Sequence, residues 1–111
     1  MGLADLHLHT TASDGMMSPR MLLNYVAMMT PLDCVAITDH DTLDGWRLAR
    51  DFRARPANEH LRALDLVPGV EVSTRDGHVL ALWVESEIPP GAVEKIRNIE
   101  GVICVRLIEA K

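Results

Sequence analysis

The chain carries histidines and carboxylates in short motifs that follow predicted strands. His7 and His9 lie two residues apart in Asp5-Leu6-His7-Leu8-His9, and His40 stands between two aspartates in Thr38-Asp39-His40-Asp41-Thr42. Imidazole nitrogens and carboxylate oxygens together suit zinc, manganese or iron better than magnesium or calcium. This set of side chains therefore predicts a site for divalent metal ions.

Each of these side chains also has an ordinary interpretation. Alternate residues of a strand project to the same side, so His7 and His9 can reach one ion, although a histidine pair on a strand is equally compatible with a surface or a core. Asp14, in Ser13-Asp14-Gly15, is either a ligand or the acid of an ordinary turn. His40 is the better ligand candidate after its strand, and Asp39 is a candidate partner that orients an imidazole. A solvated loop that ends in a helix cap explains Asp41 or Asp44 well but explains His40 poorly.

Two further candidates lie on either side of a predicted hairpin turn. Glu71 points away from the valines that flank it, which fits either a ligand or the solvent face of a hairpin. His78 opens the next strand within cross-strand range of Glu71, and it is either a ligand or a turn residue. His60 has no such neighbours, so we expect it to be exposed.

Strands and helices alternate along the part of the sequence that contains these motifs. We expect strands at residues 3–9, 35–37, 64–67, 70–74 and 78–84, with an interruption at Pro68-Gly69, and helices at residues 18–29 and 44–55. Ser18-Pro19 is typical of a helix start, and the predicted apolar face consists of Met21, Leu22, Tyr25, Val26, Met28 and Met29. Alternating strands and helices predict a mostly parallel α/β sheet, with sites at the carboxyl ends of its strands.

Length and composition limit the remaining choices. The 111 residues suit one domain, and the net charge of −5 argues against a general nucleic-acid surface and against docking on an anionic membrane. No leader or long apolar run is apparent, so we expect a cytoplasmic protein, with Cys34 and Cys104 as reduced core residues. The Pro-Pro-Gly run at 89–91 separates the motif-bearing residues 1–85 from residues 86–111, which we expect to add a helix and a strand at 102–108 to the same domain.

Taken together, the motifs at residues 5–9, 13–15, 37–42, 68–73 and 77–82 resemble, in order, those of the PHP (polymerase and histidinol phosphatase) family of metal-dependent phosphoesterases. The resemblance covers residues 5–84. It implies a partial or distorted (β/α)7 TIM-like barrel with metals at the carboxyl ends of its strands. It also implies the ligand set, in which His7 and His9 bind one metal, Asp14 and His40 bind another, Glu71 bridges two metals, and His78 is a further ligand.

The function implied by this resemblance is hydrolysis of a small phosphate ester or nucleotide by a hydroxide that two or three Zn, Mn or Fe ions activate. Asp39, His40 and Glu71 are the expected catalytic residues. We expect no stable nucleic-acid complex and no membrane association, and self-association is an open expectation.

The resemblance is incomplete at its end. By this resemblance, a full family member completes the site with a later histidine and an Asp-x-His motif. This chain has no histidine after His78 and no aspartate after Asp76. Three explanations stay open. The chain is a fragment that needs further chain or partners, a reduced domain that completes its site by self-association, or a degenerate homologue that serves as a non-catalytic metal-binding or assembly module.

Overall fold

The computed structural model describes residues 2–84 and 91–108 and contains one four-stranded sheet. The strands lie in the order β1 (Ala4–Leu8), β2 (Cys34–Ile37), β3 (Asp65–Thr74) and β4 (Gly77–Leu82). The first three are parallel, and β4 pairs antiparallel with β3. This confirms the α/β class. Within the described residues the curled sheet is open at β1 and β4, so they form no closed barrel.

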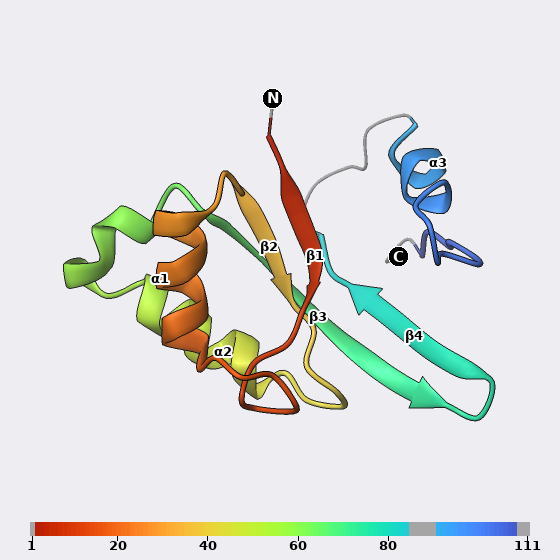
Figure 1. Ribbon diagram of the computed structural model, residues 1–111, viewed down its shortest axis with the longest axis horizontal. Coiled ribbons are helices and arrows are strands. Elements are labelled where there is room, and N and C mark those ends of the chain that lie inside the picture. Colours follow the sequence, from red (N-terminus) through yellow and green to blue (C-terminus); the bar gives the residue numbers. More distant parts are fainter. Residues whose placement is uncertain (1, 85–90, 109–111) are drawn as a thin grey trace.

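Helices cover one face of this sheet (Figure 1). They are α1 (Pro19–Met29), α2 (Asp44–Arg53) and the 3-10 helix η1 (Pro56–Leu61). Pro56 ends α2 slightly earlier than we predicted, and η1 was not predicted. The aliphatic core between helices and sheet consists of Leu22, Leu23, Val26, Val35, Ile37, Ala49, Leu61 and Leu64. Burial of a leucine such as Leu23 stabilises the fold by about 1.5–3 kcal/mol.

Helix α1 begins as predicted but presents a different face to the core. The Met21 amide donates to Ser18 Oγ at 3.2 Å, which is the expected N-cap. Leu23 is buried, whereas Met21, Tyr25, Met28 and Met29 are exposed, so the predicted apolar face is wrong in part. The apolar residues extend almost around the helix, and the sheet covers only one side of it.

Strand β3 runs unbroken through Pro68-Gly69, so the predicted interruption is wrong. Its first half pairs with β2 and its second half with β4, and the exchange occurs where Pro68 lies opposite Ile37. The Pro68 carbonyl accepts from the Trp83 amide at 3.0 Å, so the missing proline N–H does not prevent this pairing. A Cβ on Gly69 would lie 2.8 Å from side-chain carbons of Leu82 and Thr38, so only glycine fits this close approach.

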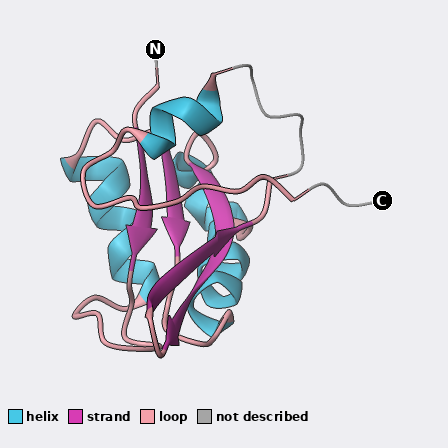
Figure 2. Cartoon of the chain, turned by 90° about the vertical axis from the view of Figure 1, so that its right-hand side faces the viewer, coloured by secondary structure: helices cyan, strands magenta, loops and turns pink. Residues whose placement is uncertain are grey.

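The C-terminal part differs from the prediction. Helix α3 (Ala92–Arg97) forms, but residues 102–108 are not a strand, and Cys104 is exposed rather than in a core. Cys34 is half-buried. Figure 2 shows α3 and the segment after it on the sheet face opposite α1 and α2. The predicted boundary between residues 85 and 86 lies outside the described residues, so the division of the chain stays a prediction.

None of the helices in the described ranges is both long and apolar enough to cross a membrane.

Candidate metal centre

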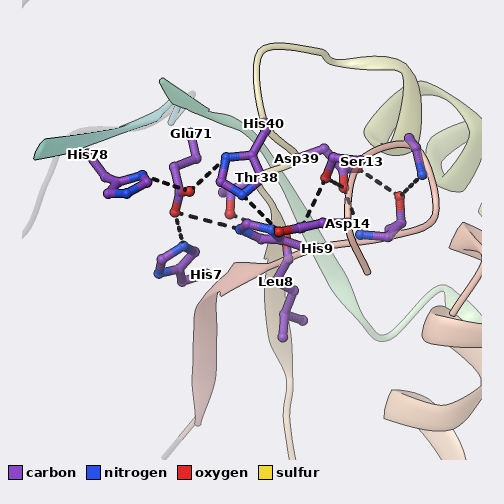
Figure 3. Close-up of polar contacts among 12 residues, drawn as sticks. His7, Leu8, His9, Ser13, Asp14, Thr38, Asp39, His40, Glu71 and His78 are labelled. Carbon is purple, nitrogen blue, oxygen red and sulfur yellow. Dashed lines mark hydrogen bonds and ion pairs between the residues drawn. The ribbon is translucent and has the colours of Figure 1, made fainter. Parts of the chain in front are cut away.

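The six predicted ligands gather at the end of the sheet where β1 and β2 finish (Figure 3). His7 lies on β1, His9 and Asp14 follow that strand, and His40 follows β2. Glu71 and His78 come from β3 and β4. The tertiary structure thus brings together residues that are up to 71 positions apart in the sequence.

Glu71 is the centre of the cluster. It is only 4% exposed, yet its carboxylate faces four imidazoles. Oε1 contacts His7 Nε2 and lies 3.6 Å from His9 Nε2, while Oε2 lies 2.9 Å from His40 Nδ1 and 3.3 Å from His78 Nδ1. The alternative of a hairpin residue on a solvent face is therefore wrong for Glu71.

Asp14 provides a second carboxylate on the other side of two of these rings. Its Oδ1 lies 2.5 Å from His9 Nδ1 and its Oδ2 lies 3.1 Å from His40 Nε2. Each of these histidines has its other ring nitrogen directed toward Glu71. His9 and His40 therefore connect the buried carboxylate with Asp14, whose side chain is 64% exposed.

The backbone after β2 places His40 opposite Glu71. The Glu71 amide donates to the Asp39 carbonyl at 3.1 Å, and the Asp41 amide donates to the Glu71 carbonyl at 3.0 Å. These bonds make His40 and Glu71 partners in a parallel bridge beyond the end of the strand. Asp41 then turns the chain with a φ of 56°, a left-handed conformation that aspartate tolerates better than most residues.

A bulge in β1 presents His7 to the cluster. Asp5 pairs with Val35 and Leu8 with Ile37, so two residues of β1 lie opposite one residue of β2. Asp5 Oδ1 accepts from the His7 amide at 3.1 Å within this bulge. Sequence reasoning gave Asp5 no role, because the register between strands cannot be read from one strand alone.

Asp39 is directed away from the imidazoles. It is fully buried, and its carboxylate accepts hydrogen bonds from Thr10 and Ser13 in the loop after β1. The prediction that Asp39 orients an imidazole is therefore wrong for the residues that the structure describes. Thr10 was missed, because a threonine after a strand has no distinctive signal of its own.

Gly15 closes the loop that carries Asp14. Its φ is not positive, so the turn does not need glycine for its backbone angles. A Cβ at this position would instead lie 2.5 Å from the His9 carbonyl oxygen. Close approach of two backbone segments thus requires glycine here. His60 lies apart, exposed as expected, with Nε2 3.0 Å from Asn24 Oδ1.

Histidines and carboxylates of the cluster stabilise one another's charged forms. Burial opposes the charged form of His9, but its hydrogen bond with Asp14 and the charges of Asp14, Glu71 and Asp39 outweigh burial and raise the pKa of His9. The hydrogen bond from His9 is the main cause that lowers the pKa of Asp14. Burial acts to raise the pKa of Glu71, yet bonding and charge from His7, with the charges of His40 and His9, lower it.

The ligand atoms form three overlapping groups, and within each group they lie within 4.8 Å of one another. We name each group by the residue that belongs to it alone. The groups are the His7 triad (His7, His9, Glu71), the Asp14 triad (His9, Asp14, His40) and the His78 triad (His40, Glu71, His78). Three mixed nitrogen and oxygen donors per group fit zinc, manganese or iron.

Comparisons with known proteins identify relatives that act on phosphate esters. The chain is 39% identical over 89 residues to the 5'-3' exoribonuclease Rnm of Salmonella typhimurium, which covers 77% of this chain and 29% of the relative. It is 32% identical over 93 residues to the 3',5'-nucleoside bisphosphate phosphatase of Chromobacterium violaceum, with 80% and 30% covered. No protein-family profile matches the chain.

A solved structure shares the fold of most of this chain. An amidohydrolase from Chromobacterium violaceum, with bound sulfate and no metal, superposes with a TM-score of 0.58 at 30% identity. The superposition covers 74% of this chain and 28% of the amidohydrolase. The chain therefore spans less than a third of each of these three proteins.

Proposed function

Over about three-quarters of its length this chain belongs to the PHP (polymerase and histidinol phosphatase) family of phosphoesterases, and from this premise we propose that it hydrolyses a phosphate ester of a nucleotide with divalent metal ions. The observation that carries the proposal is the buried Glu71 carboxylate, which faces four imidazoles and belongs to two triads. Burying a carboxylate is costly unless cations or donors surround it, and an ordinary core does not need one. A buried carboxylate among four imidazoles therefore indicates a functional site.

The residues fit the ions that the proposal needs. Glu71, His9 and His40 each belong to two triads, while His7, Asp14 and His78 would each complete one triad. Glu71 would share ions through its two oxygens, and His9 and His40 would do so as imidazolates, because a neutral ring has one free nitrogen. When bound, divalent ions lower the pKa of a water molecule toward neutrality and offset charge on phosphoryl oxygens. The lowered pKa values of Asp14 and Glu71 support this assignment, since they keep both side chains in the ionised carboxylate form that binds metal ions.

Exposure within the cluster indicates where a substrate would enter. The side chains of His7, Asp14 and His78 are 55%, 64% and 63% exposed, whereas Glu71 lies beneath them. A phosphate ester can therefore approach the open side of the triads. The chain itself is anionic at −5, so the ions, which would add about four to six positive charges, would make the site attractive to a phosphate.

Among the three expected catalytic residues, His40 and Glu71 keep a role at the reacting centre in this proposal. They would hold ions from two sides of the cluster. Asp39 would not contact substrate, because Thr10 and Ser13 occupy its buried carboxylate.

The substrate class rests on what the relatives are named for. One acts on RNA and the other on a nucleoside bisphosphate, and both substrates contain a phosphate ester of a nucleotide. We therefore propose a nucleotide or a short oligonucleotide as substrate. The alternative, a metal-binding module without turnover, uses the same cluster and differs only in the outcome of the assay.

The test begins with the full chain, stripped with a chelator and reloaded with Mn²⁺ or Zn²⁺. Metal content per chain is measured, together with hydrolysis of p-nitrophenyl phosphate, a nucleoside 3',5'-bisphosphate and a 5'-phosphorylated oligoribonucleotide. We expect at least two ions per chain and metal-dependent release of product. Fewer than two ions and no turnover of any substrate would overturn the proposal, while bound ions without turnover would favour the non-catalytic module.

The same preparation tests self-association, which we propose because β1 and β4 leave both edges of the sheet unpaired within the described residues. Light scattering after gel filtration should give a dimer or larger species. A monomer with full activity would contradict self-association and would leave the proposed activity unaffected.

A further inference from the structure

We propose that a buried hydrogen-bond network around Asp39 controls occupancy of the Asp14 triad separately from the other two triads. The Asp39 network consists of Thr10, Ser13 and Asp39, and Gly45 packs against it. This inference rests on the metal binding proposed above, but it concerns residues that are not ligands. It makes Asp39 a positioning residue rather than a catalytic one.

Asp39 uses both carboxylate oxygens to hold the loop after β1. Oδ1 accepts from the Thr10 amide at 2.7 Å and from Ser13 Oγ at 2.7 Å, and Oδ2 accepts from Thr10 Oγ1 at 2.8 Å. Asp39 and Thr10 are both fully buried. Hydrogen bonds to a charged and buried acceptor are among the stronger ones in proteins, and removing a donor leaves that charge short of a partner.

Thr10 links Asp39 to the part of the loop that carries Asp14. Its carbonyl accepts from the Ser13 amide at 3.1 Å and from the Gly15 amide at 2.8 Å, and these two residues flank Asp14. Its Oγ1 also accepts from the Ala12 amide at 3.1 Å. The backbone on both sides of Asp14 is therefore fixed to Thr10, and Thr10 is fixed to Asp39.

Helix α2 encloses the network from the other side. A Cβ added to Gly45 would lie 2.0 Å from Asp39 Oδ2 and 2.6 Å from Thr10 Oγ1. The first turn of α2 therefore approaches the carboxylate so closely that only glycine fits. Sequence reasoning missed Gly45, because a glycine at the start of a helix is common and this contact joins three separate segments.

The other two triads depend mainly on the sheet. His7, Glu71 and His78 lie on β1, β3 and β4, and main-chain hydrogen bonds on either side of His40 hold it next to Glu71. His9 comes directly after β1, where the Thr38 amide and hydroxyl donate to the Leu8 carbonyl at 2.7 and 3.2 Å. Asp14 is the only ligand on the loop beyond Thr10. Loosening the Asp39 network should therefore displace Asp14 and leave the His7 and His78 triads intact.

The decisive variant is Thr10→Val, which keeps the shape of the side chain and removes one donor to Asp39. We expect it to bind one Mn²⁺ fewer than the wild type at the same free Mn²⁺, or to bind that ion about ten- to hundred-fold more weakly, as for other partners that orient ligands. Asp14→Asn should show the same loss. Thr10→Ser, which restores the hydroxyl, should recover the wild-type stoichiometry.

Thr11→Val is the matched control, because the Thr11 side chain makes no hydrogen bond within the described residues. Ser13→Ala removes a different donor to Asp39 and tests the same inference if Thr10→Val fails to fold. Amide hydrogen exchange of the metal-free chain gives a second readout. The Ser13 and Gly15 amides should lose protection in Thr10→Val, while amides of β2 and β3 keep theirs.

The outcomes separate the two proposals. A wild-type chain that binds no metal ion overturns the proposed function, and with it this inference. Metal binding and amide protection that are the same in Thr10→Val, Ser13→Ala and the wild type overturn this inference alone. Loss of all ions from a folded Thr10→Val variant also overturns it, because the triads would then not be separable.

Discussion

His40 and Glu71 are joined through both their backbones and their side chains. Their imidazole and carboxylate lie 2.9 Å apart, and main-chain hydrogen bonds run from the Glu71 amide to Asp39 and from the Asp41 amide to Glu71. Because the ladder fixes the spacing of the two Cα atoms, the contact between the side chains needs little further ordering. His40 and Glu71 therefore hold a fixed position relative to each other, and the other residues of the cluster contact one or both of them.

Glu71→Gln should remove metal from more than one position. The amide keeps the size of the side chain but lacks the negative charge that two triads share. We expect at least two ions to be lost or bound more than about tenfold more weakly, with activity falling in parallel. Metal analysis after dialysis measures this, and His60→Gln is the control. Retention of every ion in Glu71→Gln would show that Glu71 is not a shared ligand.

His7→Ala and His9→Ala should differ in how many ions they lose. His7 belongs to one triad and His9 to two, so we expect one ion to be lost from the first variant and two from the second. Titration with Co²⁺, followed by absorbance, counts the ions in each variant. His60→Ala should match the wild type, because His60 contacts Asn24 and no cluster residue. Equal losses from all three variants would contradict the assignment.

The pH dependence of the metal-free chain should reveal the His9–Asp14 contact. The pKa of His9 is raised above its ordinary 6.5. The stabilisation it provides is therefore fully present below pH 6.5 and is lost as the pH rises through the raised pKa. In chelator, the free energy of unfolding of the wild type should fall more between pH 6.5 and about pH 8 than that of Asp14→Asn. Urea denaturation at the two pH values measures this, and parallel curves would contradict it.

Asp41→Val should destabilise the fold and disturb His40. Asp41 has a φ of 56°, and a β-branched side chain in that conformation costs roughly 1–2 kcal/mol. Asp41→Gly, which adopts this φ without strain, should be close to the wild type in thermal unfolding and in metal content. If valine and glycine have the same effect, the side chain of Asp41 matters and its backbone conformation does not.

Local sequence signals predicted much of the fold because they depend on neighbouring residues. Ser18-Pro19 marked the start of α1, Pro56 limited α2, and Asp76-Gly77 marked the hairpin between β3 and β4. The errors occurred where one element meets another. Pro68-Gly69 continues β3 because β2 and β4 pair with it in turn, and the exposed Met28 and Met29 show that periodicity does not reveal which side of a helix the sheet covers.

The sequence by itself determined which residues could serve as ligands, because donor chemistry and spacing along a strand are properties of the chain. His7, His9, Asp14, His40, Glu71 and His78 were candidates on these grounds, and the resemblance to the PHP family implied that all six are ligands. Only the tertiary structure decided which of these residues belong to more than one triad. The bulge of β1 against β2 lets Asp5 Oδ1 accept from the His7 amide, and next to α2 Asp39 accepts from Thr10 in the loop after β1. Such contacts depend on distances between segments that are remote in sequence, and these distances exist only after the chain has folded.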